Sequence, residues 1–383
     1  MPAATSSAPP PSARPTESAL PSAEPSETAI GDCGQAVAAT APNGSLTQSL
    51  AVFPTADGLS LYDVEADSVS ILDPAATRLG MRPQFRTSGL VSFVRQRELP
   101  DEGHLFGQDS LWEFDLESGR SEEILRLPSG LLGFDWSPDG TRLAYLVQGH
   151  SATTEMPVSL CLFDTRTASA RLLRSLEPWI GRGGNQRDEV VVTWSPTVDQ
   201  VLVVDTLEYP TVLVVDLDGR DVVPPQLGTF GRWLSNQRVL FQKHPNNTTL
   251  PWDWISISTT TGDARRFDLP SDAYRPALSP SGEMIAFDDG DGGAPSIYVF
   301  DRVQGTSRKL ASGYVAPVWL GPELLAATAA VPCPPGYFCV IPWLATDATL
   351  AIDVRSGESH PIALGTTMQG WPFGTIDVLV APE

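Results

Sequence analysis

Basic residues are scarce in this chain of 383 residues. Lysine and arginine together number 25 against 46 aspartates and glutamates, which gives a formal net charge of −21 at pH 7. A surface this acidic repels a phosphate backbone, and no run of lysine and arginine offsets that field. We therefore expect no nucleic-acid partner. Solubility explains the acidity, with a basic partner or a bound cation as the alternatives.

Histidine and cysteine are also scarce, with four residues of each type. The histidines have no pair at the spacing of metal ligands, and no cysteines form a C-x-x-C motif, so neither a zinc site nor a redox site is indicated. Cys333 and Cys339 bracket a loop rich in proline and glycine, and we expect them to form a disulfide in an oxidising compartment. For Cys33 and Cys161 two interpretations stay open, a second bridge or a buried free thiol at Cys161.

Large apolar side chains are nearly absent from residues 1–31, which are mainly proline, serine, alanine, threonine and glutamate. Such a segment buries too little apolar surface to offset its ordering entropy, so we predict a disordered stalk before a single folded domain over residues 32–383. Stalks of this kind follow an export signal or lipid anchor in bacterial exported proteins. We therefore expect a periplasmic, cell-surface or secreted protein whose signal or anchor precedes this sequence, and no transmembrane segment within it. A cytoplasmic protein with a disordered tail is the alternative.

Amphipathic helical patterns are missing from about residue 48 onward, where strands alternate with turns. The clearest unit is Phe134–Tyr145, in which the turn Ser-Pro-Asp-Gly separates two apolar strands. In this turn proline presets φ, aspartate bonds back to the backbone, and glycine tolerates the conformation needed to enter the second strand. Copies occur at 194–203 and 278–287. In each unit a later strand ends in aspartate, at Asp115, Asp164, Asp216, Asp301 and Asp353.

The first strands of these units end at regular intervals of about 40 to 60 residues, the size of a four-stranded propeller blade. Their last residues are Phe85, Trp136, Trp194, Trp233, Leu278, Trp319 and Trp371. This spacing predicts an all-β fold, a seven-bladed β-propeller whose tryptophans pack between neighbouring blades. Residues 48–73 lack a first strand, and the segment around Trp371 lacks the rest of a blade. We predict that residues 367–380 pair with residues 48–73, so that one blade is closed by N- and C-terminal strands.

The repeat resembles that of the TolB-like propellers, a family of bacterial exported proteins with W-S-P-D-G-x-x-(I/L)-A-(F/Y) units. The resemblance rests on 136–145, 194–203 and 278–287 with the strand-ending aspartates, and it covers most of residues 48–380. It implies a propeller and an extracytoplasmic location. It says little about function, because such repeats occur in periplasmic interaction proteins, surface lipoproteins and propeller modules of peptidases. The Ser-Pro-Asp-Gly turn is lost in the fifth and seventh predicted blades, at 234–237 and 320–323, which predicts irregular loops there.

Polar residues beside the first strands are the candidate binding residues. By register they gather at one mouth of the central channel, where the positive ones would form a local anion site. They are Arg82, Gln84, Asp135, Arg232, Tyr274 and Arg275.

An acidic, glycine-rich turn offers a candidate calcium loop at Asp288, Asp289 and Asp291, since hard cations bind several oxygens at a sharp glycine turn. The full EF-hand pattern is not met, and an ordinary turn between two strands is the alternative. No other cofactor is predicted. The serines Ser137, Ser195 and Ser279 recur in turns and have no base beside them, so a structural role is expected.

From these features we expect an exported, non-enzymatic propeller that acts as a monomeric scaffold, binding a protein or another ligand at the cell envelope. The alternative is a propeller enzyme or carbohydrate-binding protein with its site in the loops over one mouth of the channel. Irregular inserts at 96–109, 148–157, 243–254 and 330–347 motivate that alternative.

Overall fold

The computed structural model describes residues 33–38, 49–55, 58–74, 83–87, 89–97, 108–148, 155–180, 191–205, 211–243, 253–290, 294–332, 343–363 and 377–379. Within these ranges all regular structure is β-strand, which confirms the all-β prediction. In chain order the strands are β1 (Gln35–Ala36), β2 (Leu50–Thr55), β3 (Gly58–Asp63), β4 (Ser68–Asp73), β5 (Gln84–Thr87), β6 (Leu90–Gln96), β7 (Asp109–Asp115), β8 (Arg120–Arg126), β9 (Leu131–Trp136), β10 (Arg142–Gln148), β11 (Glu155–Asp164), β12 (Ser169–Ile180), β13 (Val191–Trp194), β14 (Gln200–Asp205), β15 (Thr211–Asp216), β16 (Asp221–Ser235), β17 (Arg238–Lys243), β18 (Asp253–Ser258), β19 (Ala264–Arg266), β20 (Tyr274–Leu278), β21 (Met284–Asp288), β22 (Ser296–Asp301), β23 (Thr306–Ser312), β24 (Tyr314–Trp319), β25 (Leu324–Pro332), β26 (Trp343–Asp353), β27 (Ser359–Ala363) and β28 (Asp377–Leu379).

Most of these strands form four-stranded antiparallel sheets in which consecutive strands are neighbours. The orders β12-β11-β10-β9, β20-β21-β22-β23 and β24-β25-β26-β27 each make one such sheet, and β5 to β8 make another that β1 extends at its outer edge. A larger sheet runs from β13 to β19 through the 15-residue strand β16. The first half of β16 pairs with β15 and its second half pairs with β17, so this one strand joins two four-stranded units.

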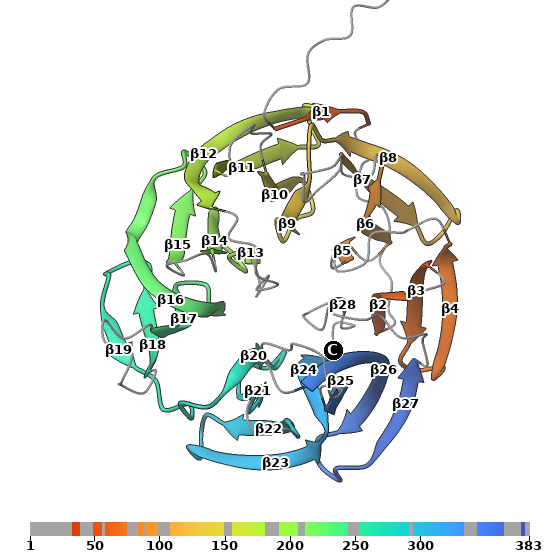
Figure 1. Cartoon of the computed structure of the whole chain (residues 1–383), viewed down its shortest axis with the longest axis vertical. Helices are drawn as coiled ribbons and strands as arrows, with labels where there is room; N and C mark the ends of the chain where they lie inside the picture. Colours follow the sequence, from red (N-terminus) through yellow and green to blue (C-terminus); the bar gives the residue numbers. More distant parts are fainter. Residues whose placement is uncertain are drawn as a thin grey trace, which may run out of the picture.

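The sheets stand around a common centre, and the chain visits them in sequence order (Figure 1). Strands β5, β9, β13, β20, β24 and β28 lie nearest the centre, and β4, β8, β12, β19, β23 and β27 lie at the rim. This is the blade arrangement of a β-propeller. None of the described segments forms a helix that could cross a membrane.

One sheet is built from both ends of the chain. Its order is β28-β2-β3-β4, and Leu379, Val378 and Asp377 of β28 lie opposite Leu50, Ala51 and Val52 of β2. The predicted pairing of residues 367–380 with residues 48–73 is therefore confirmed. The paired residues are 377–379, whereas Trp371, which we expected to end this strand, lies outside the described residues.

Hydrophobic clusters fill the spaces between neighbouring sheets. One cluster joins Leu111 and Ile124 of the β5–β8 sheet to Trp136 and Leu143 of the β9–β12 sheet. Four of the buried tryptophans add a hydrogen bond to the preceding inner strand or the strand beside it. The indole Nε1 atoms donate over 2.8 Å from Trp136 to Ser92 Oγ, 2.8 Å from Trp194 to Asp135 O, 3.2 Å from Trp233 to Thr193 O, and 2.9 Å from Trp319 to Ala277 O. The predicted packing of tryptophans between blades is confirmed for these four residues.

The Ser-Pro-Asp-Gly turn is held by its own side chains. Ser137 Oγ donates to Asp139 at 2.6 Å and accepts the amide N–H of Arg142 at 2.9 Å. Gly140 has φ +64, and a Cβ atom there would lie 2.5 Å from Thr87 Cγ2 of the neighbouring sheet. The turn therefore needs glycine both for its backbone conformation and for its contact with the next blade.

A disulfide joins the N-terminal segment to the ring. Cys33 and Cys161 have their Cα atoms 5.7 Å apart, and their bond settles the question that the sequence left open. Cys33 precedes β1, which pairs with β8, while Cys161 is in β11 of the neighbouring sheet. The bridge therefore links two adjacent blades. The predicted stalk (1–31) and the predicted disulfide of Cys333 with Cys339 lie outside the described residues.

Candidate functional site

The predicted channel-mouth residues that the structure describes all lie on strands nearest the centre. Gln84 is in β5, Asp135 in β9, Arg232 in the inner half of β16, and Tyr274 and Arg275 in β20 (Figure 1). Arg82 lies outside the described residues. The structure places these side chains in two groups, one on β5 and β9 and the other on β16 and β20.

The first group ties successive blades together. The buried Gln84 donates from Nε2 to Phe134 O of β9 at 2.6 Å. Asp135 accepts the amide N–H of Trp194 on the next blade at 2.6 Å, and its own carbonyl accepts the indole of the same tryptophan. Gln84 and Asp135 thus connect three consecutive inner strands, β5, β9 and β13.

In the second group, Arg275 is buried in an ion pair with Asp288. Its Nε atom lies 2.7 Å from Asp288 Oδ2, and Nη2 donates to Oδ1. The same carboxylate accepts the amide N–H of Ala316 on β24 at 3.0 Å. Burial raises the pKa of Asp288, and its bonds to Arg275 and Ala316 act in the opposite direction. This pair therefore holds the β20 and β24 blades together at their inner ends.

The ion pair also supports an irregular backbone. Arg275 has φ 48 beside a bulge in the pairing of β20 with β21, and Ala316 has φ 53 beside a bulge in β24. Phe230 takes φ 53 at a bulge in β16. These residues stand three positions before Leu278, Trp319 and Trp233, so the bulge is a repeated feature of the inner strands. Positive φ is costly for residues other than glycine and persists only where neighbouring groups fix the conformation.

Arg232 and Tyr274 are the more accessible members of the set. Arg232 is half-buried and donates from Nη1 to Gly231 O at 2.9 Å, while 36% of the Tyr274 surface is exposed. The Tyr274 ring meets Phe230 edge-to-face with centroids 5.4 Å apart. A Cβ atom on Gly290, which has φ +54, would lie 2.5 Å from the same ring. Tyr274, packed against Phe230 and Gly290, and Arg232 therefore lie on neighbouring inner strands.

The acidic turn proposed for calcium has other partners. The Asp288 carboxylate bonds to Arg275 and Ala316, and Asp289 Oδ1 accepts the amide N–H of Ser296 at 2.8 Å. Asp291 lies outside the described residues. Within the part of the chain that the structure describes, no three histidine, cysteine, aspartate or glutamate side chains gather as metal ligands would.

A second buried ion pair, between Arg86 and Glu113, was not foreseen from the sequence. Arg86 Nη1 lies 2.9 Å from both carboxylate oxygens of Glu113, and Nε donates to Gly140 O at 2.7 Å. Its guanidinium also lies over the Trp136 ring, 4.5 Å from the centroid. The pair anchors the Ser-Pro-Asp-Gly turn to the preceding blade. The only signal in the sequence is an arginine directly after Phe85, the end of a predicted strand.

No protein-family model and no curated protein matches this chain. Solved structures similar to it include an oligogalacturonate lyase in complex with manganese, at 14% identity over 71% of this chain and 79% of that one, with a TM-score of 0.53. A puromycin-hydrolyzing peptidase of Mycobacterium tuberculosis is 14% identical over 89% of this chain and 57% of its own length, with a TM-score of 0.53. TolB from Acinetobacter baumannii is 16% identical over 86% of this chain and 81% of that one, with a TM-score of 0.46. At these identities the likeness concerns the fold alone.

Proposed function

We propose that this β-propeller, whose repeats resemble those of TolB-like proteins, is an exported binding protein that acts outside the cytoplasm and catalyses no reaction. Its ring has seven blades in this proposal, one of them closed by β28 and β2. The division of the β13–β19 sheet at β16 supports that number, because it turns six sheets into seven four-stranded units. A fold of this kind hosts many activities, so the function has to be argued from its sites.

The observation that carries the proposal is the buried disulfide between Cys33 and Cys161. Disulfides form and persist in oxidising compartments and are rare in the cytoplasm. This one fixes residues 33–36 to the ring, which supports a single domain over 32–383 with residues 1–31 as its stalk. We place the protein at the cell envelope or beyond it, as a monomer.

We assign binding of a protein partner to the mouth of the ring around Arg232 and Tyr274. Arginine and tyrosine are enriched among the residues that dominate protein interfaces. Gln84, Asp135 and the Arg275–Asp288 pair join neighbouring blades at other inner strands of the ring and so keep its mouth rigid. A rigid rim lowers the entropy lost when a partner binds.

The test is retention of a partner by the full chain, immobilised and exposed to an envelope extract of its source organism. We expect one protein to be retained by the unchanged chain and lost with Arg232→Ala and with Tyr274→Ala. Arg265→Ala on the exposed strand β19 is the matched control and should retain it. Equal retention by all variants would contradict binding at the mouth. Hydrolysis or cleavage of an offered peptide or oligosaccharide by the purified chain would favour the enzymatic alternative instead.

A further inference from the structure

Each blade ends in a rim strand, and the outer edge of such a strand presents backbone N–H and C=O groups that can pair with another chain. Proteins block these edges with charged side chains, with proline or with an added segment. In this ring β1 covers the edge of β8. The other rim strands, apart from β4, carry basic residues or proline. These are Arg171 and Arg174 on β12, Pro224 and Pro225 on the first half of β16, Arg265 and Arg266 on β19, Arg308 and Lys309 on β23, and Pro361 on β27.

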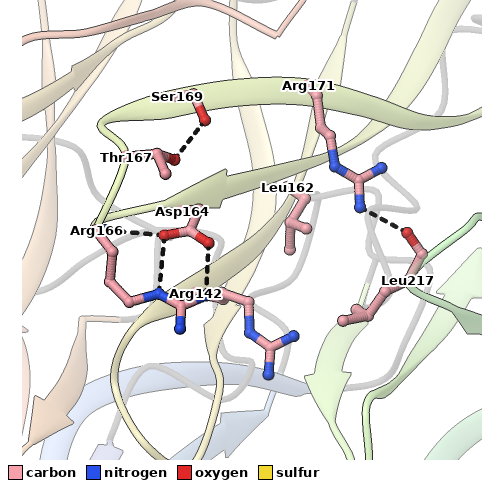
Figure 2. Close-up of a pocket in the computed structure, with 8 residues that line it drawn as sticks. All are labelled: Arg142, Leu162, Asp164, Arg166, Thr167, Ser169, Arg171 and Leu217. Atoms are coloured by element: carbon pink, nitrogen blue, oxygen red, sulfur yellow. Dashed lines mark hydrogen bonds and ion pairs between the residues drawn. The ribbon is translucent and has the colours of Figure 1, made fainter.

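Two of these arginines are also bonded to the next blade. Arg171 donates to Leu217 O at 2.7 Å across a hollow between the β11–β12 hairpin and the neighbouring blade (Figure 2). Arg308 donates in the same manner to Val354 O. The positive charge is therefore held at the rim on β12 and on β23.

The rim strand β4 has no such protection. Ser68–Leu72 contains no charged residue and no proline, and Asp73 at the end of the strand is buried in an ion pair with Arg95. β4 is the last strand of the sheet β28-β2-β3-β4, so no described strand pairs with its outer edge, which lies at the rim (Figure 1). The first four residues of β4 are all exposed. This edge is open to another chain.

Val69 and Ile71 make the β4 edge apolar. Their side chains are 46% and 54% exposed. They lie opposite Tyr62 and Ser60 of β3, and cross-strand partners share one face of a sheet. On that face Tyr62 packs into the cluster that joins this sheet to the β24–β27 blade. Val69 and Ile71 therefore extend the apolar layer between two blades out to the solvent.

The strand β1 shows how this ring accommodates an added strand. Gln35 and Ala36 pair antiparallel with Arg126 and Leu125 of β8. Ala36 also packs against the cluster between the β5–β8 and β9–β12 sheets. An added strand thus combines backbone pairing at the rim with apolar contact between blades, and the β4 edge offers both.

The charge around β4 determines which kind of strand suits this edge. Glu65 and Asp67 are exposed in the turn that enters β4, and 63% of the Asp67 side chain is accessible. The net charge of −21 opposes pairing with an acidic segment or with a second copy of the chain. In antiparallel pairing, the arrangement of β1 on β8, the residues opposite Ile71, Val69 and Asp67 follow one another at intervals of two. A lysine or arginine in the last of these positions meets the Asp67 carboxylate.

We propose that the outer edge of β4 binds an extended segment of a partner protein as an additional antiparallel strand. The segment has two apolar residues in alternate positions, which lie beside Ile71 and Val69, and a lysine or arginine two positions later, beside Asp67. This surface shares no residue with the channel mouth, so the failure of one assignment leaves the other intact.

The test is fluorescence anisotropy of a labelled, end-capped peptide, Ser-Val-Thr-Val-Ser-Lys-Gly, titrated with the full chain at low salt. We expect saturable binding. Ile71→Lys should weaken it tenfold or more, because the new charge replaces an apolar contact and repels the lysine of the peptide. Leu172→Lys is the matched control, since it makes the same change on the rim strand β12 at a side chain that is 44% exposed. It should alter the affinity less than threefold. Both positions are exposed, and a circular dichroism spectrum checks that both variants fold.

Two further comparisons test the charge and the backbone pairing. Asp67→Asn should weaken binding of the lysine peptide threefold or more and leave binding of a glutamine version unchanged. In an added strand only alternate N–H groups face the neighbouring strand. Of two peptides, one N-methylated at both valines and the other at the threonine and serine between valine and lysine, one should therefore lose binding and the other keep it.

The proposal is overturned if the peptide does not bind, if Leu172→Lys weakens binding as much as Ile71→Lys does, or if both methylated peptides bind as tightly as the parent. An equal effect of Asp67→Asn on the lysine and glutamine peptides would contradict the assigned charge contact. Sedimentation of the chain without peptide tests the other occupant. A dimer that Ile71→Lys dissociates would assign the edge to a second copy and overturn the proposal as well.

Discussion

The guanidinium of Arg275 lies against the carboxylate of Asp288 with Nε 2.7 Å from Oδ2, and both side chains are buried. Sequence patterns assign these residues to two different sites, an anion site and a cation site. The structure pairs them with each other, and the amide N–H of Ala316 from the next blade completes the set. A buried charge whose partner is removed is strongly destabilising.

We therefore expect Asp288→Ala to lower the free energy of unfolding by about 3–5 kcal/mol, because Arg275 is left buried and uncompensated. Urea unfolding at pH 7 measures the loss. Asp263→Ala, at an exposed position of the turn before β19, is the control and should stay within about 0.5 kcal/mol of the unchanged chain. A loss for Asp288→Ala as small as that of the control would show that the pair contributes little to stability.

Trp194 is the clearest test of the bonds between blades. Its indole donates to Asp135 O at 2.8 Å, so Trp194→Phe removes this bond and keeps an aromatic ring. The expected cost is about 1 kcal/mol for the bond, whereas Trp194→Ala should cost about 3–5 kcal/mol because it also empties the space between two blades. Unfolding midpoints of the two variants give the comparison. If both variants lose the same free energy of unfolding, packing of the Trp194 ring between the blades contributes nothing beyond the hydrogen bond.

Loss of the Cys33–Cys161 bridge should lower the free energy of unfolding, because the unfolded chain then gains the conformational entropy that the bridge removes. The bridge spans 128 residues of sequence, and loop entropy assigns a closure of that size about 5 kcal/mol. The double variant Cys33→Ala with Cys161→Ala should show most of this loss in urea unfolding without reductant. If the variant unfolds at the same urea concentration as the oxidised chain, the bridge does not constrain the unfolded ensemble.

Acid should destabilise the protein through the aspartates that end strands of the repeat, such as Asp115 at the end of β7 and Asp353 at the end of β26. The backbone N–H of Ser118 donates to Asp115 and is the main cause that lowers the pKa of this carboxyl. The backbone N–H of Ser356 lowers the pKa of Asp353 in the same way. A carboxyl with a lowered folded-state pKa stabilises the fold above its unfolded pKa of about 3.9, and this contribution is lost as the pH falls through the folded value. Stability should therefore drop below about pH 4. Asp115→Asn should flatten the dependence, and an unchanged slope between about pH 5 and pH 3 would contradict this origin.

The repeat made the fold predictable, because alternation, turn residues and aromatic strand ends recur along the chain. The tryptophan contacts could be predicted from that regularity. The closing strand was placed in the correct segment, residues 367–380, and its described pairing is at 377–379, whereas the strand end expected at Trp371 lies outside the described residues. Three residues at the end of a sheet carry too little pattern to be distinguished from their neighbours.

Side-chain partners were harder to predict, because they come from different blades. Arg86 and Gly140, or Arg275 and Ala316, come together only once the sheets stand side by side. The hollow between the β11–β12 hairpin and Leu217 likewise needs residues from two neighbouring blades (Figure 2). The pairing of Cys33 with Cys161 was left open for the same reason, since cysteine spacing does not determine connectivity.

The thiol state of the protein in its own cells is the most direct test of an exported, disulfide-bonded propeller. Thiols are blocked with an alkylating agent before lysis, and the protein is digested without reduction and analysed by mass spectrometry. We predict a peptide pair joined through Cys33 and Cys161, and a bonded Cys333 and Cys339 as well. Recovery of Cys33 and Cys161 in alkylated form would contradict both the bridge and the extracytoplasmic location that it supports.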